Sequence, residues 1–178
     1  GILIRRQGVG TFVRSYKDTG LWNRFQKFMR KDGRLPVFES NPLRLEIIPA
    51  PENVAEKMKI MPGDPVIRCL RDMSDNGERT GVDVAYLDLA TFRDLKIEDL
   101  EDVKGNLYKL YEEKLGVFIA DVTDILEFVI IDKEIQKICD LPLGTPLFFV
   151  TRQSRLLNKK TVEIRYEYCS AVNYRLRI

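Results

Sequence analysis

The 178-residue sequence contains no histidine, so it lacks the commonest general base and the commonest metal ligand of proteins. Only three cysteines are present, Cys69, Cys139 and Cys169, and none has the C-x-x-C spacing of a zinc or redox site. An odd, widely spaced set predicts reduced and packed thiols of an intracellular protein rather than a disulfide framework. We therefore expect no metal centre, no cofactor and no His-based catalytic triad.

Long apolar runs and an excess of one charge are also missing. No segment reaches the roughly 18 apolar residues of a membrane span, and no signal peptide is evident. The 29 basic and 27 acidic residues give a net charge of +2, too balanced for binding nucleic acid through bulk charge. Hydrophobic content of 44% and charged content of 31% are typical of a globular domain with a sizeable core. These values predict a cytoplasmic protein.

The first thirteen residues contain a glycine-rich hairpin pattern. Two β-forming runs, 2–6 and 11–13, flank a Gln-Gly-Val-Gly segment. Glycines two residues apart between such runs predict a tight β-hairpin. Arg5 and Arg6 lie beside its turn, which suits a DNA minor groove but also an ordinary surface hairpin.

The remaining sequence predicts a mixture of helices and strands after a polar linker at 14–19. The apolar periodicity predicts helices at 20–32, 52–60, 106–115 and 133–139, and strands at 43–47, 66–74, 81–88, 117–131, 147–156 and 161–169. A final edge strand or tail is expected over 171–178. The fold class is therefore α+β, with one antiparallel sheet of about six strands and helices on one face.

One pattern occurs twice: a helix, a Gly-x-Pro turn, a strand, a polar turn and a returning strand. One constant offset relates three pairs of residues, Gly63 and Gly144, Pro65 and Pro146, and Arg71 and Arg152. Two related hairpin units would give the sheet pseudo-twofold symmetry. The alternative is coincidence, because glycine and proline punctuate any fold.

Some charged residues lie among apolar neighbours on their own strand face. Arg71, Asp83 and Glu127 have apolar residues at the i±2 positions, which predicts that they point inward. A buried charge must be paired or face a ligand. Arg71 and Asp83 lie on adjacent strands, so they either pair with each other or bind an effector together. In the second case Arg71 holds an anionic group and Asp83 accepts from a hydroxyl or amine.

A second charged row lies on the last long strand. Glu163, Arg165 and Glu167 share one face, and apolar and aromatic residues line the other. The charged row is either solvated surface or the wall of a pocket.

The segment Arg5-Arg6-Gln7-Gly8-Val9-Gly10-Thr11-Phe12-Val13 resembles the wing of the winged helix-turn-helix in GntR-family transcription regulators. The resemblance implies that residues 1–13 are the remnant wing of a truncated DNA-binding domain. It implies that 14–19 is a linker and 20–178 an effector-binding and dimerisation domain. The wing residues implied to contact DNA are Arg5, Arg6, Gln7, Gly8, Gly10 and Thr11.

The order and spacing of later motifs resemble the UTRA effector-binding domain of the HutC subfamily of these regulators. The motifs lie at 20–33, 49–50, 63–71, 107–108 and 144–163. The resemblance implies a chorismate lyase-like fold, a homodimer, and a small-molecule effector that changes DNA binding, with repression the commoner mode.

The resemblance also implies an effector site at Asn23, Arg24, Phe25, Arg71, Met73, Asp83, Glu163 and Arg165. Met73 stands where sugar-phosphate-binding members carry a second arginine, and only Tyr174 remains of a Y-R-x-D-x-Y pattern in the last strands. The effector is thus expected to be a phosphorylated sugar or a carboxylate metabolite. The alternatives are an enzyme on the related lyase fold acting on a small carboxylate, and a dimerisation module without a ligand. No histidine, nucleophile–base pair or metal cluster supports the enzyme.

Overall fold

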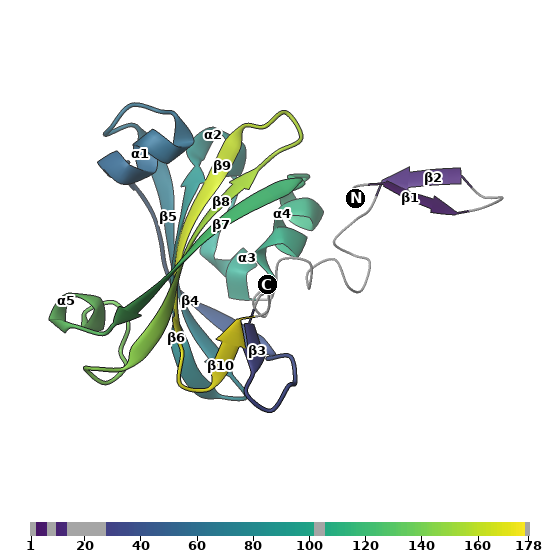
Figure 1. Ribbon diagram of the computed structural model, residues 1–178. Coiled ribbons are helices and arrows are strands. Elements are labelled where there is room, and N and C mark those ends of the chain that lie inside the picture. Colours follow the sequence, from purple (N-terminus) through teal and green to yellow (C-terminus); the bar gives the residue numbers. More distant parts are fainter. Residues whose placement is uncertain (1–2, 7–9, 14–27, 102–105, 177–178) are drawn as a thin grey trace.

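The computed structural model describes residues 3–6, 10–13, 28–101 and 106–176. Its centre is a six-stranded, fully antiparallel sheet with strand order β4-β5-β6-β9-β8-β7 (Figure 1). The strands are β4 (Phe38–Pro49), β5 (Pro65–Asp75), β6 (Glu78–Asp88), β7 (Asp121–Ile130), β8 (Pro146–Arg155) and β9 (Thr161–Ser170). The helices are α1 (Glu52–Met58), α2 (Leu89–Phe92), α3 (Ile97–Glu101), α4 (Leu107–Leu115) and α5 (Lys133–Gln136). The predicted α+β class and six-stranded antiparallel sheet are confirmed.

The strand order is symmetrical about the contact between β6 and β9. The succession β4-α1-β5-β6 in the first half corresponds to β7-α5-β8-β9 in the second. Gly63 and Gly144 precede β5 and β8 with φ of 88° and 81°, a conformation that glycine adopts without strain. The predicted repeat is therefore a structural relationship and not a coincidence of turn residues.

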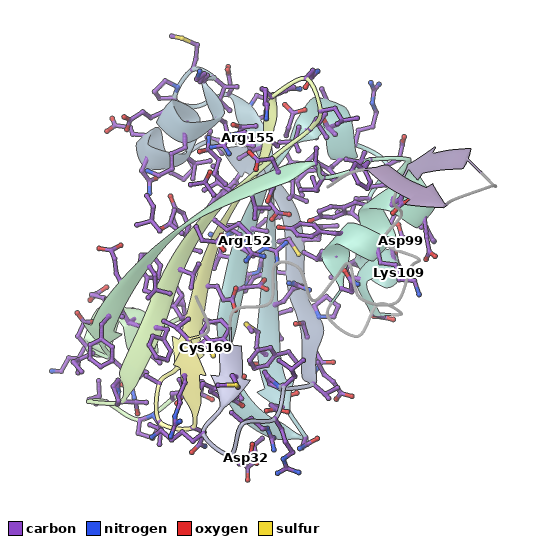
Figure 2. The ribbon with its side chains drawn as sticks, turned by 45° about the vertical axis from the view of Figure 1, so that its right-hand side comes forward. Asp32, Asp99, Lys109, Arg152, Arg155 and Cys169 are labelled. Atoms are coloured by element: carbon purple, nitrogen blue, oxygen red, sulfur yellow. The ribbon has the colours of Figure 1, made fainter. Side chains whose placement is uncertain are left out.

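Two smaller sheets accompany the large one. β1 (Leu3–Arg6) and β2 (Gly10–Val13) pair as the predicted N-terminal hairpin. β3 (Phe28–Arg30) pairs with β10 (Tyr174–Leu176), and Asp32 lies in the turn after β3 (Figure 2).

The helix predicted over 20–32 is wrong at its end. Phe28 is in a strand and is buried against the rings of Phe38, Phe148 and Tyr174. Contacts from distant parts of the chain thus override the helical spacing of its neighbours. The rest of that prediction lies outside the described residues.

Two strand boundaries also differ from the prediction. The strand predicted at 43–47 extends over Phe38–Pro49, and the ladder shifts register next to Pro42. Proline is tolerated there because β4 is an edge strand. The strand predicted from Val117 begins at Asp121, since α4 ends at Gly116, whose φ is 65°.

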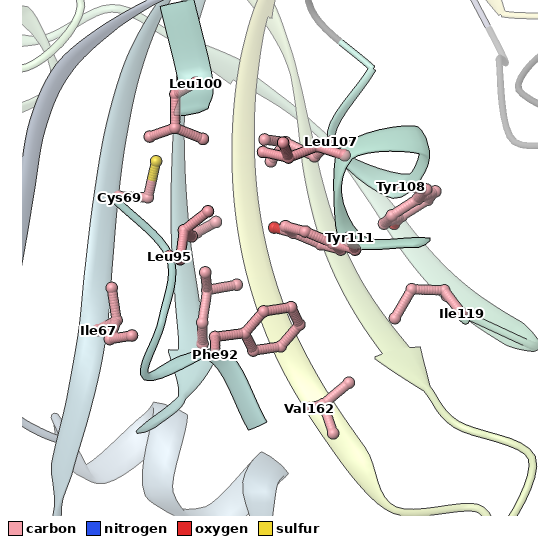
Figure 3. Close-up of a cluster of buried hydrophobic side chains, with 13 residues drawn as sticks. Ile67, Cys69, Phe92, Leu95, Leu100, Leu107, Tyr108, Tyr111, Ile119 and Val162 are labelled. Atoms are coloured by element: carbon pink, nitrogen blue, oxygen red, sulfur yellow. The ribbon is translucent and has the colours of Figure 1, made fainter. Parts of the chain in front are cut away.

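The prediction that the helices cover one face of the sheet is wrong, because they lie on both faces. Helices α2, α3 and α4 cover one face, where a core that includes Ile67, Leu87, Phe92 and Tyr111 is buried (Figure 3). Helices α1 and α5 cover opposite ends of the other face, α1 against Ile164 and α5 near Leu147. The charged residues of interest lie on the α2–α4 face.

Candidate functional site

A row of charged side chains crosses the sheet beneath α3 and α4. The strand register places Arg71 opposite Asp83, and Asp83 opposite Glu167. Two residues before Glu167 on β9, Arg165 lies opposite Arg152 of β8. Arg152 in turn lies opposite Asp124 of β7. Arg152 lies at the middle of the sheet in Figure 2. We name these residues, together with Glu163, the buried charged face.

Arg71 and Asp83 form a buried, two-pronged ion pair. The Arg71 Nε donates to Asp83 Oδ1 at 3.0 Å, and Nη2 donates to Oδ2. Both side chains are buried. Burial acts to lower the pKa of Arg71, but the Asp83 carboxylate outweighs it and the net pKa is raised. The predicted salt bridge between these residues is confirmed, and a ligand contact of Arg71 remains a prediction.

Arg152 and Asp124 form a second such pair. The Arg152 Nε and Nη2 donate to the two carboxylate oxygens at 2.7 and 2.8 Å. Both side chains are almost wholly buried. Charge-assisted forks of this kind fix both the position and the orientation of the guanidinium.

Glu163 is fully buried and is held by hydroxyl groups. Tyr111 Oη donates to Oε2 at 2.9 Å, and Ser154 Oγ and Tyr108 Oη donate to Oε1 at 3.1 and 3.3 Å. The two tyrosines come from α4, so one helix covers the carboxylate and satisfies it. Burial and the Glu163 charge raise the pKa of the Tyr111 hydroxyl, which keeps it a donor.

Arg165 differs from the other two arginines because some of its donors are unused. Its Nη2 lies 2.8 Å from Glu163 Oε1, but without the geometry of a hydrogen bond. Its Nε and Nη2 are buried and have no hydrogen-bond partner among the residues that the structure describes. The guanidinium carbon lies 5.3 Å from the centroid of the Tyr108 ring. Burial acts to lower the pKa of Arg165, but Glu163 outweighs it and the net pKa is raised, so the group stays charged.

Glu167 adds a carboxyl group that is partly buried beside Asp83. Burial raises the pKa of Glu167, and the Asp83 charge raises it further. Negative charge added by a ligand would be met chiefly by Arg165, whose ion pair with Glu163 lacks the geometry of a hydrogen bond.

The structure brings together four of the predicted site residues, Arg71, Asp83, Glu163 and Arg165. Their placement on a covered face rules out the solvated-surface interpretation of Glu163 and Arg165. Met73 is buried on β5, two residues from Arg71. The remaining predicted effector residues, Asn23, Arg24 and Phe25, lie outside the described residues, as do the wing residues Gln7 and Gly8.

The inward orientation predicted for Glu127 is wrong. Glu127 is exposed, because β7 is the edge strand and neither of its faces is fully covered at that point. Sequence reasoning also missed Asp124, Ser154, Tyr108 and Tyr111. The repeat had marked the position of Arg152 without assigning it a function.

The three cysteines are free and buried, as predicted for packed thiols. No helix in the described part of the chain is long and apolar enough to cross a membrane.

The comparisons with a family model, a curated protein and solved structures agree with one another. The family model described as the UTRA domain matches residues 37–175. YurK of Bacillus subtilis (strain 168), an uncharacterized HTH-type transcriptional regulator, is 28% identical over 173 residues. These cover 96% of this chain and 68% of YurK.

Two solved structures show how far the fold is shared. One is the ligand-binding domain of a protein from Bordetella bronchiseptica described as a GntR-family transcriptional regulator. It has a TM-score of 0.79 and 27% identity, over 87% of this chain and 96% of that chain. YydK of Bacillus subtilis, described as a transcriptional regulator, has a TM-score of 0.72 over 99% of this chain and 75% of its own. Its identity is 17%, so that likeness shows the fold alone.

Proposed function

The chain belongs to the UTRA domain family, the effector-binding domain of GntR-family transcription regulators, and on that premise we propose that its buried charged face binds a small anionic effector. The observation that carries the proposal is Arg165, a buried guanidinium whose Nε has no hydrogen-bond partner among the described residues and whose Nη2 lies only against Glu163, without hydrogen-bond geometry. Leaving such donors unsatisfied costs about 1–3 kcal/mol, and more for a charged group, so a ligand that accepts from them is favoured.

The groups around Arg165 favour an effector that is both anionic and hydrogen-bonding. A guanidinium with free donors suits a carboxylate or phosphate oxygen. The carboxylate of Glu163 and the hydroxyls of Tyr108 and Ser154 lie within one hydrogen-bonded network beside it. These groups can accept from and donate to hydroxyl or amine groups of the same ligand. A phosphorylated sugar or a hydroxylated or amino carboxylate fits this combination.

In the full regulator, we expect effector binding to change the affinity for operator DNA, most often by releasing a repressor. The hairpin of β1 and β2 would be the wing of the DNA-binding domain, with residues 14–19 as the linker and 20–178 as the sensor. The regulator would act as a homodimer, because a two-fold protein reads two operator half-sites. We place it in the cytoplasm, where its operator is.

The relatives and solved structures compared above are described as regulators or their domains, not as enzymes, which argues against the alternative of a lyase-like enzyme.

A thermal-unfolding screen tests the proposal. Sugar phosphates, amino acids and small carboxylates are added singly to the chain, with uncharged sugars of the same size as controls. A ligand that binds the native state raises the melting temperature, and at concentrations above Kd the rise grows with the logarithm of the concentration. We expect a concentration-dependent rise with at least one anionic compound and none with its uncharged counterpart. No shift across the whole panel would contradict the sensor and support a dimerisation module without a ligand.

A further inference from the structure

Glu167 is the fourth carboxyl group of the buried charged face, which has three arginines. Each arginine lies against one of the other three carboxylates. Among the residues that the structure describes, none forms an ion pair with Glu167 or donates a hydrogen bond to it. Glu167 is also only partly buried, whereas Asp83 and Arg165 beside it are buried. Its carboxyl group is therefore an acceptor that the protein itself leaves unused.

The carboxyl groups of Glu167 and Asp83 face each other across strands β6 and β9. Like charges directly opposite each other on a sheet are destabilising. Burial and the Asp83 charge raise the pKa of Glu167, although Arg152 acts in the opposite direction. Asp83 accepts one hydrogen bond from Arg71 on each oxygen, and each carboxylate oxygen can accept a second. A cation between the two carboxyl groups would thus remove their repulsion and be bound by both.

We propose that the effector carries a protonated amine beside its anionic group, and that Glu167 and Asp83 bind the amine while Arg165 binds the anion. The proposal rests on the proposed function and deepens it, from an anionic effector to one that carries charges of both signs. An amino carboxylate or a phosphorylated amino sugar has this chemistry.

The spacing of Arg165 and Glu167 suits one small molecule. The two residues lie two positions apart on one face of β9, which separates their Cα atoms by about 6.6 Å. Both side chains are long, so an anion and an amine that are a few bonds apart in a ligand can contact both of them. Such a ligand brings charge of both signs, which costs less at a buried site than charge of one sign.

An amine fits the Glu167 and Asp83 carboxyl groups better than a hydroxyl group does. A hydroxyl has one proton to donate, whereas an ammonium group has three and can donate to both carboxyl groups at once. The ammonium group also carries the charge that the two facing carboxyl groups lack, and hydrogen bonds between charged groups are the stronger ones. The arrangement therefore favours the amine over its hydroxyl counterpart.

Matched pairs of compounds test the choice between amine and hydroxyl. Calorimetric titration of the chain compares serine with glycerate, aspartate with malate, and glucosamine 6-phosphate with glucose 6-phosphate. Each pair keeps the anionic group and exchanges the amine for a hydroxyl. We expect at least one amine compound to bind, with a Kd at least about tenfold lower than that of its hydroxyl counterpart.

The outcomes separate this proposal from the one on which it rests. A hydroxyl compound that binds as tightly as its amine counterpart, or more tightly, would overturn the amine site and leave the anionic effector standing. Binding by no compound of either kind would contradict the proposed function and the amine site together.

Two variants test whether the preference comes from Glu167. Glu167→Gln keeps the size of the side chain and removes its charge, so the Kd of the preferred amine compound should rise at least about tenfold, towards that of the hydroxyl counterpart. Glu127→Gln is the matched control, because Glu127 is exposed on the edge strand β7, and it should leave both Kd values unchanged. Circular dichroism confirms that both variants are folded. An undiminished preference for the amine compound in folded Glu167→Gln would overturn the role of Glu167.

Discussion

Arg71 and Arg152 occupy equivalent positions in the two halves of the sheet, but their carboxylate partners lie on non-equivalent neighbouring strands. Arg71 pairs with Asp83 on the central strand β6, whereas Arg152 pairs with Asp124 on the edge strand β7. The residue of β9 that faces Arg152, as Asp83 faces Arg71, is Arg165. An arginine thus replaces an acid in the second half.

That replacement explains why Arg165 has unused donors. Arg152 lies directly across the strand and repels it, and the nearest carboxylate, Glu163, is already held by three hydroxyls. The pseudo-symmetry of the sheet therefore places a guanidinium where its nearest acid, Glu163, lies close but without hydrogen-bond geometry. We regard this break in the pseudo-symmetry as the physical origin of the proposed anion site.

Removing Arg71 should destabilise the protein strongly. Arg71→Ala leaves Asp83 as an uncompensated buried charge, which costs about 3–5 kcal/mol. The double variant Arg71→Met with Asp83→Leu replaces the pair by apolar groups of similar size and should recover most of that loss. Urea unfolding of the three proteins measures both effects. Equal stability of Arg71→Ala and wild type would show that the pair is dispensable.

Tyr111→Phe should cost about 1–3 kcal/mol of stability, because Glu163 loses its shortest hydroxyl donor while buried. Tyr108→Phe removes a longer bond to the same carboxylate and should cost less. Chemical unfolding of the two variants in parallel compares them. A larger loss in Tyr108→Phe would contradict the description of how Glu163 is held.

The raised pKa of Glu167 predicts a pH dependence of stability. The folded state holds this proton to a higher pH than the unfolded state, whose value is near 4.5. The contribution of Glu167 is therefore most favourable below that value and is lost as the pH rises through the folded pKa.

The glutamine of the Glu167→Gln variant cannot ionise. The free energy of unfolding of the variant should therefore rise relative to that of the wild type as the pH increases from 4.5 upward. Denaturant unfolding at a series of pH values, with the difference taken between the two proteins, isolates this group from the others. A difference that does not change with pH, or that shrinks as the pH rises, would argue against the raised pKa of Glu167.

Much of the fold could be predicted from the sequence, because the local sequence signals agree with the global structure. The polar turn predicted between the strands at 66–74 and 81–88 is a two-residue hairpin, in which Asn76 and Gly77 both have positive φ. The repeat was visible because its turns need glycine and proline at fixed offsets. The pairing of Arg71 with Asp83 followed from alternation along two adjacent strands.

The errors and omissions come from contacts between residues that are far apart in the sequence. Phe28 is in a strand because β10, nearly 150 residues later, pairs with it, and no local pattern could indicate that. Glu127 is exposed because β7 is an edge, a property of strand order rather than of spacing. Tyr108 and Tyr111 occupy apolar helix positions, and only the placement of α4 over Glu163 shows that their hydroxyls are needed.

The most direct test of the effector site is calorimetric titration of wild type and Arg165→Gln with an anionic ligand from the thermal screen. Arg44→Gln is the control, because that arginine is largely exposed and lies on the distant edge strand β4. We predict at least a tenfold weaker Kd for Arg165→Gln, equivalent to about 1.4 kcal/mol, and an unchanged Kd for Arg44→Gln. An unchanged Kd in a folded Arg165→Gln protein would contradict the claim that this buried guanidinium binds the effector.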